Sequence, residues 1–190
     1  DHVLQLEHAS TTLFPELASA GIGGRLSARR ASLTDRVAEV AAMVNSTDGA
    51  WVVWCGLNDE SDAITAAVEG AVNVEGSDAY DDKRRAVEDF VAGRVRVIVS
   101  KPRILGFGLN LQHCHQMAFV GMSDSYEAYY QCLRRCWRFG QKYPVDAHIV
   151  VSEAEAIVVE NVRRKQAAAR DLSQALISHM RDFEREELIA

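Results

Sequence analysis

The sequence contains no long hydrophobic run and no leader-like segment at its start. No apolar stretch approaches the ~20 residues that a membrane-spanning helix needs. The first residues also lack the charged and then apolar pattern of a secretory signal. We therefore expect a soluble, cytoplasmic protein without a membrane partner. Because the chain begins at Asp1, we interpret it as a piece of a longer protein.

Cysteine is scarce and unpaired in its spacing. The four cysteines, none of which belongs to a Cys-x-x-Cys pair, are Cys55, Cys114, Cys132 and Cys136. Such spacing in an intracellular chain predicts reduced thiols and excludes a disulfide framework. His113 and His115 flank Cys114, but alternate residues of an extended segment face opposite ways, and no second ligand cluster has a suitable spacing. We therefore expect no metal site.

Lysine is also scarce, and none of the four lysines follows a glycine; they are Lys83, Lys101, Lys142 and Lys165. This excludes the P-loop, Gly-x-x-x-x-Gly-Lys-Ser/Thr, in which backbone amides and a lysine hold nucleotide phosphates. Gly56 stands alone after the first predicted strand. A complete dinucleotide- or methyl-donor-binding enzyme would need Gly-x-Gly-x-x-Gly there, so we disfavour that alternative.

Residues 59–62, Asp-Glu-Ser-Asp, match the acidic box with which nucleotide-hydrolysing enzymes hold magnesium. Three residues separate this run from the strand predicted at 51–55. Acidic side chains that open a helix stabilise its positive end without binding a metal, and we favour that structural interpretation.

The composition fits one globular domain. A chain of 190 residues with 48% hydrophobic content can bury one good core. The net charge of -6 argues against a protein coated in nucleic acid, although binding depends on local charge. We predict a joining or helical segment over 1–31, the main domain over 32–152, and a helix over 153–190 that packs back on the domain.

Helical and strand-like segments alternate from residue 32 onward. This pattern predicts an α/β fold with a mainly parallel sheet flanked by helices. The predicted strands are 51–55, 71–74, 95–100, 117–120 and 147–151, and the predicted helices are 33–44, 59–68, 80–91 and 125–138. We interpret Trp51 and Trp54 as core residues of the first of these strands.

The segment 131–141 contains two arginines at a helical spacing of three. Arg135 and Arg138 should lie on one face of a helix, and paired guanidiniums are suited to forked bonds with phosphate oxygens. The alternative is that both arginines form surface ion pairs with Glu127 or Asp124. Upstream, Gly106 and Gly108 free the backbone to approach a partner closely. Ligands gather at the carboxyl ends of strands in such sheets, where this loop and the arginine helix should converge.

The order of these pieces resembles the C-terminal RecA-like lobe of superfamily 2 helicases, most closely the Swi/Snf-type DNA-dependent ATPases and their phage or prophage relatives. The sixth motif of that family, Gln-x-x-x-Arg-x-x-Arg-x-Gly-Gln, is matched by Gln131, Arg135, Arg138, Gly140 and Gln141. The end of the fifth, Gly-x-Gly-x-Asn-Leu, is matched by Gly106, Gly108, Asn110 and Leu111. Departures from the usual pattern fall at Leu105, Cys132, Arg134 and Trp137.

The resemblance implies a RecA-like three-layer domain that shares an ATP site with an N-terminal lobe. That lobe would hold most of the ATP and Mg²⁺, while Arg135 and Arg138 would act as arginine fingers, with Arg138 as the main finger. Gln131 would contact the phosphate region or orient the fingers. The resemblance also implies nucleotide contacts from Gly106, Gly108, Asn110, Gly140 and Gln141. It implies DNA contacts from Lys101, Arg103, Gly76, Ser77, Lys83, Arg84 and Arg85. The chain alone should not hydrolyse ATP.

Two purely structural alternatives remain open beside this interpretation. The glycine loop can be a plain turn between strand and helix, and the basic run 83–85 can be a solvated helix face. A non-catalytic docking module for nucleic acid or protein is the alternative function, although it would have no evident use for Gln131, Arg135 and Arg138.

Overall fold

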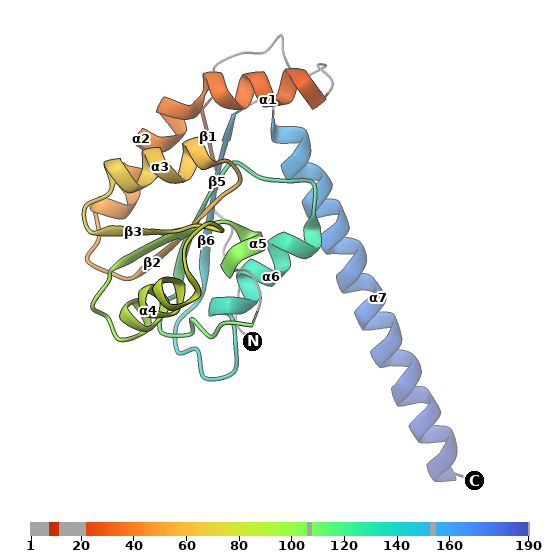
Figure 1. Cartoon of the computed structure of the whole chain (residues 1–190). Helices are drawn as coiled ribbons and strands as arrows, with labels where there is room; N and C mark the ends of the chain where they lie inside the picture. Colours follow the sequence, from red (N-terminus) through yellow and green to blue (C-terminus); the bar gives the residue numbers. More distant parts are fainter. Residues whose placement is uncertain (1–7, 12–21, 106–107, 153–154, 190) are drawn as a thin grey trace.

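Six parallel strands form the centre of the computed structural model, which describes residues 8–11, 22–105, 108–152 and 155–189 (Figure 1). The order of the strands across the sheet is β1-β6-β5-β2-β4-β3. Their bounds are β1 His8–Thr11, β2 Trp51–Cys55, β3 Ala71–Val74, β4 Val97–Ser100, β5 Gln116–Val120 and β6 Asp146–Ser152. Among the described residues every pair of neighbouring strands is parallel, which confirms the predicted parallel sheet.

Helices cover both faces of this sheet. Their bounds are α1 Ile22–Ala31, α2 Leu33–Asn45, α3 Asn58–Ala67, α4 Tyr80–Val91, α5 Pro102–Leu105, α6 Tyr126–Cys136 and α7 Ala156–Ile189. One face packs against α2 and α3, whereas the other packs against α4, α5, α6 and the first turns of α7. The α/β architecture expected from the alternating segments is therefore confirmed.

The central strand β2 shows how the sequence builds the two cores. All five of its residues are buried. Trp51, Val53 and Cys55 belong to the core beneath α2 and α3, whereas Val52 and Trp54 belong to the core on the opposite face. Successive side chains of a strand point to opposite faces, so a continuous apolar run fits a strand covered on both sides. Both tryptophans are core residues, as predicted.

The sheet extends further toward the N-terminus than the sequence indicated. The segment 1–31 was expected to join the domain to another part of the protein, partly as a helix. Within it, α1 is helical, but β1 also pairs with β6, with His8 opposite Ile149. The sequence of β1, His-Ala-Ser-Thr, contains no apolar run of the kind that identified the other strands.

The C-terminal helix α7 packs on the domain through its first turns. Val158, Val159 and Val162 are buried against the sheet face that also holds α6. Further along, Leu172, Leu176, Ile177 and Met180 are exposed by 51 to 64%. Figure 1 shows α7 leading away from the sheet. In the described ranges, no helix combines the length and apolarity needed to span a membrane.

Candidate functional site

Arg135 and Arg138 converge on the carbonyl oxygen of Leu109. Arg135 donates to that oxygen from Nη1 over 3.1 Å, and Arg138 donates to it from Nη1 over 3.2 Å. Arg135 also donates to Gln131, from Nε to the backbone oxygen and from Nη2 to Oε1, each over 3.0 Å. The loop that precedes β5 is thus tied to the end of α6, as the two motifs predicted.

The two arginines are not equally accessible. The helix α6 ends at Cys136, so Arg138 lies in the following turn and not on the same helical face, contrary to the prediction. Arg138 is exposed, whereas Arg135 is only 8% exposed. Burial and the nearby Arg138 cation lower the pKa of Arg135. Internal acceptors occupy the nitrogens of Arg135, so its guanidinium is less available to a ligand than that of Arg138.

No carboxylate neutralises this pair of cations within the part of the chain that the structure describes. The ion pairs found there involve other arginines, namely Arg29, Arg36, Arg84, Arg85 and Arg94. Among the described residues, neither Arg135 nor Arg138 forms the surface ion pair that the alternative interpretation requires. Two guanidiniums that share one neutral acceptor leave an electropositive spot beside the exposed Arg138.

The remaining motif residues divide into internal and exposed groups. Gln141 is buried, and its Nε2 donates to the backbone oxygens of Gln112, Cys114 and Cys136. Its side chain therefore holds the loop together and is not open to a nucleotide, contrary to the prediction. Gly108 and Gly140 adopt positive φ values of 77° and 94°, which a side chain would strain.

Asn110 is exposed on the same loop as Leu109, and its Oδ1 accepts a hydrogen bond from the amide of Gln112. Gly106 lies outside the described residues.

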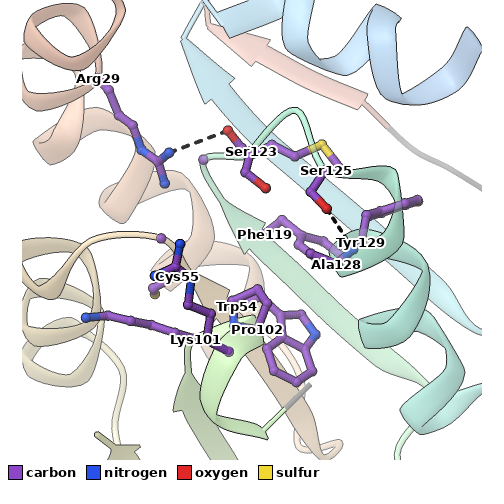
Figure 2. Close-up of a pocket in the computed structure, with 14 residues that line it drawn as sticks. Arg29, Trp54, Cys55, Lys101, Pro102, Phe119, Ser123, Ser125, Ala128 and Tyr129 are labelled. Carbon is purple, nitrogen blue, oxygen red and sulfur yellow. Dashed lines mark hydrogen bonds between the residues drawn. The ribbon is translucent and has the colours of Figure 1, made fainter. Parts of the chain in front are cut away.

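A cavity of about 590 Å³ opens at the other end of α6 (Figure 2). It lies where β2, β4 and β5 end, because Cys55, Lys101 and Gly121 all line it. The predicted DNA-contacting residues Lys101 and Arg103 are both in its wall. Lys101 Nζ donates to Asn58 Oδ1, and Arg103 is exposed on the short helix α5.

The remaining predicted DNA contacts lie on and before α4. A Cβ added to Gly76 would lie 3.9 Å from Cδ1 of Ile104 on α5, so this turn neighbours the helix that carries Arg103. Lys83 Nζ donates to the Gly76 oxygen over 2.7 Å, and Ser77 lies in the same turn. Arg84 and Arg85 are exposed and pair with carboxylates of their own helix, at Asp81, Asp82 and Glu88. Such exposed pairs contribute little to stability and leave the cations accessible.

A buried ion cluster next to the cavity was missed by the sequence interpretation. Glu60 is fully buried and accepts hydrogen bonds from Arg29 on α1, from Arg36 on α2, and from the amides of Gly56 and Leu57. Arg29 also lines the cavity. Glu60 lies in the acidic run 59–62, but its separation of 31 residues from Arg29 gives no local sign in the sequence that the two pair.

Comparison with known proteins identifies the class. The parallel sheet order and the loop tied to an arginine-bearing helix define a RecA-like lobe. The family model "Helicase conserved C-terminal domain" matches residues 36–140, and the chain belongs to this family. No curated protein sequence matches.

Three solved structures share the fold. The C-terminal part of the Fun30 ATPase domain has a TM-score of 0.61 at 13% identity, covering 67% of this chain and 44% of that one. The C-terminal domain of the DEAD-box protein Dbp5 has a TM-score of 0.63 at 12% identity, covering 87% and 86%. A DEAD box protein from the hyperthermophile Methanococcus jannaschii has a TM-score of 0.61 at 12% identity, covering 70% and 37%. The chain thus spans less than half the length of the first and third.

Proposed function

We propose that this chain is the C-terminal lobe of an ATP-dependent DNA translocase of the Swi/Snf type. In this proposal the lobe contributes an arginine finger and DNA-backbone contacts to a site completed by an N-terminal lobe. The observation that carries the proposal is the convergence of Arg135 and Arg138 on Leu109 without a carboxylate partner among the described residues. An exposed cation held in this way suits an anionic ligand such as a nucleotide phosphate.

Arg138 is the catalytic arginine in this proposal. Its guanidinium is exposed, and among the described residues it makes one hydrogen bond, to Leu109, which leaves donors for phosphate oxygens. Bound ATP supplies the phosphoryl group whose transfer builds up negative charge. A finger that stabilises such charge contributes ~10³ to 10⁵ in rate.

Arg135 is a positioning residue in this scheme. Its bonds to Gln131 and Leu109 hold the fifth-motif loop at the base of the finger.

Magnesium is assigned to the other lobe. In the described ranges, no group of three His, Cys, Asp or Glu side chains is placed to hold a metal ion. The residues of this chain fit a phosphate and do not fit a cation, because Arg135 and Arg138 would repel one.

DNA contacts are assigned to the surface formed by α5 and the turn before α4. Arg103, Lys83 and the Gly76 turn lie in this region, and α5 follows the carboxyl end of β4. Lysine and arginine contacts to phosphates position a strand without reading its sequence, as a translocase requires.

A non-catalytic docking module is the second candidate, because the structure uses Arg135 and Gln141 internally. The test is DNA-stimulated ATP hydrolysis by the full-length protein, or by this chain supplemented with its N-terminal lobe. We expect turnover that Arg138→Ala abolishes. Arg134→Ala is the matched control, because the Arg134 guanidinium lies over the Trp137 ring, 5.1 Å from its centroid. Turnover that survives Arg138→Ala, or no turnover from the complete protein, contradicts the proposal.

A further inference from the structure

The C-terminal helix α7 has an apolar stripe that continues beyond the domain on which the helix packs. Val158 and Val162 are buried in the core near the start of this helix. Leu176 and Met180 follow them about five full turns later, at 3.6 residues a turn, and therefore lie on the same face. Leu172 lies on this face one turn before Leu176. The face that is buried at the start of α7 is thus still apolar where the helix has left the sheet (Figure 1).

The far part of this stripe is open to solvent. Leu172, Leu176 and Met180 are each more than half exposed. All residues from 170 to 180 are exposed. A contiguous apolar surface of this kind marks an interaction site, and a helical segment without packing is only marginally stable in water. The stripe therefore calls for a second surface that covers it.

The charges along α7 are separated into two segments of opposite sign. The segment 163–170 holds three arginines and one lysine and no acidic residue. All four cations are exposed, and the ion pairs found among the described residues involve other arginines. The segment 182–187 holds four acidic residues and one arginine. Between the two segments, residues 172–180 include no Asp, Glu, Lys or Arg.

A second copy of α7 that runs antiparallel matches both the stripe and the charges. A two-fold axis at Leu176 places Leu172 opposite Met180 of the second copy, and Arg170 opposite its Asp182. The basic segment of each copy then faces the acidic segment of the other, and complementary charges at such flanking positions set the orientation of paired helices. A parallel pair would instead place like charges next to each other. The charge pattern therefore selects an antiparallel second copy as the covering surface.

We propose that this chain forms an antiparallel dimer through α7, in which Leu172, Leu176 and Met180 form the buried seam and the two charged segments form its flanks. At a rise of 1.5 Å a residue, Val162 lies ~20 Å along the helix from the axis at Leu176. The two domains are therefore held at opposite ends of the helix pair. The inference goes beyond the proposed function and does not depend on it.

The test is sedimentation equilibrium of the purified chain, loaded at about 2 to 200 µM to bracket micromolar affinities. We expect a monomer–dimer equilibrium that depends on concentration. The double variant Leu172→Ser, Leu176→Ser should weaken the dimer by at least about a hundredfold, because each pair loses four leucine side chains from its seam. Both leucines are exposed in the single chain, so the thermal midpoint of unfolding of the domain should stay unchanged.

Ile157→Ser is the matched control for the leucine variant. Ile157 is also on α7 and is 50% exposed, but it lies about 100° around the helix from Leu176. The dimer should form as readily in this variant as in the unmodified chain.

Charge reversal tests the direction of the pairing. Arg170→Glu should weaken an antiparallel dimer about tenfold, because two attractive pairs across the seam become repulsive. Adding Asp182→Arg should restore the affinity, since the two charges are then exchanged and complementary again. In a parallel dimer Arg170 would face its own copy, so Arg170→Glu would replace one repulsion with another and change little.

A chain that stays monomeric over the whole concentration range overturns the inference. So does a dimer that survives the double leucine variant, that Ile157→Ser weakens equally, or that Asp182→Arg fails to restore. The effect of Arg138→Ala on ATP turnover tests the proposed function separately, so the two failures are distinguishable.

Discussion

Arg29 of α1 and Glu60 of α3 form a two-point ion pair, with Nε 2.6 Å from Oε1 and Nη2 2.7 Å from Oε2. Arg36 adds a third bond to Oε1 over 2.9 Å. Burial by itself would raise the pKa of Glu60, but the hydrogen bond from Arg29 and the charges of both arginines outweigh it and place the pKa below the ordinary value of 4.5. This pair fixes α1 against the strand ends that surround the cavity.

The pH dependence of stability follows from the lowered pKa of Glu60. A carboxyl whose folded pKa lies below its unfolded pKa stabilises the fold fully above the unfolded pKa, and this contribution is lost as the pH falls through the folded value. We expect the free energy of unfolding in urea to decrease as the pH falls below about 4.5. In Glu60→Gln the decrease should be shallower; equal slopes for the two proteins would contradict the assignment.

Loss of the Glu60 charge should destabilise the chain at neutral pH. Glu60→Gln leaves Arg29 and Arg36 with Glu155 as the remaining paired carboxylate among the described residues, 3.6 Å from Arg29 Nε. Breaking a buried pair by removing one partner costs about 3 to 5 kcal/mol. Urea unfolding measures this cost. Glu88→Gln, which removes an exposed carboxylate paired with Arg84, should change stability by less than about 1 kcal/mol; similar losses in both variants would refute the prediction.

The Arg29 guanidinium also requires glycine at two neighbouring positions. A Cβ added to Gly56 or Gly121 would collide with it, and Gly121 has a φ of 79°. Gly93 has a φ of 74° with nothing within 4 Å of an added Cβ, so Gly93→Ala measures backbone strain alone, about 1 to 2 kcal/mol. We expect Gly121→Ala to lose more stability than Gly93→Ala in thermal unfolding. Equal losses of stability in the two variants would mean that the Arg29 guanidinium moves aside with no cost in free energy.

Substitution of Arg135 should lower the stability of the fold, whereas substitution of Arg138 should lower the rate of ATP hydrolysis. Arg135→Ala removes donors to Gln131 and Leu109 and should cost about 1 to 3 kcal/mol of stability. Arg138→Ala should leave unfolding nearly unchanged and lower kcat of the complete protein by ~10³ or more. The measurements are urea unfolding of the chain and ATP turnover of the full-length protein. If Arg138→Ala is the less stable variant and retains turnover, the roles are reversed.

Local periodicity was sufficient for most of the fold. The strands at 51–55 and 71–74 and the helix at 80–91 have the bounds that the sequence indicated. Their signals are short apolar runs and an amphipathic pattern that lie within single elements. Motif spacing also indicated that the loop at Leu109 meets the arginine helix, because both motifs border the same sheet.

What could not be predicted depends on contacts between distant segments. Nothing near Arg29 indicates Glu60, and nothing near Gln141 indicates that its amide is occupied by three backbone carbonyls. Motif identity gives no measure of burial, so the sequence could not show that Arg135 is buried and Arg138 exposed. A buried donor without a hydrogen-bond partner among the described residues, such as Trp54 Nε1, can be recognised only when the coordinates of the surrounding residues are known.

The 34 residues of α7 would extend about 50 Å at the rise of an α-helix. Among its described side chains, those in the core belong to the first turns, at Val158, Val159 and Val162. Beyond these residues Leu172 and Leu176 are exposed, so the helix there is stabilised by its own backbone hydrogen bonds and not by packing of these side chains. Isolated helical segments in water are marginal. In the monomeric chain, amide protons should therefore exchange with solvent progressively faster from Val162 toward Met180, giving this one helix a gradient of protection along its axis.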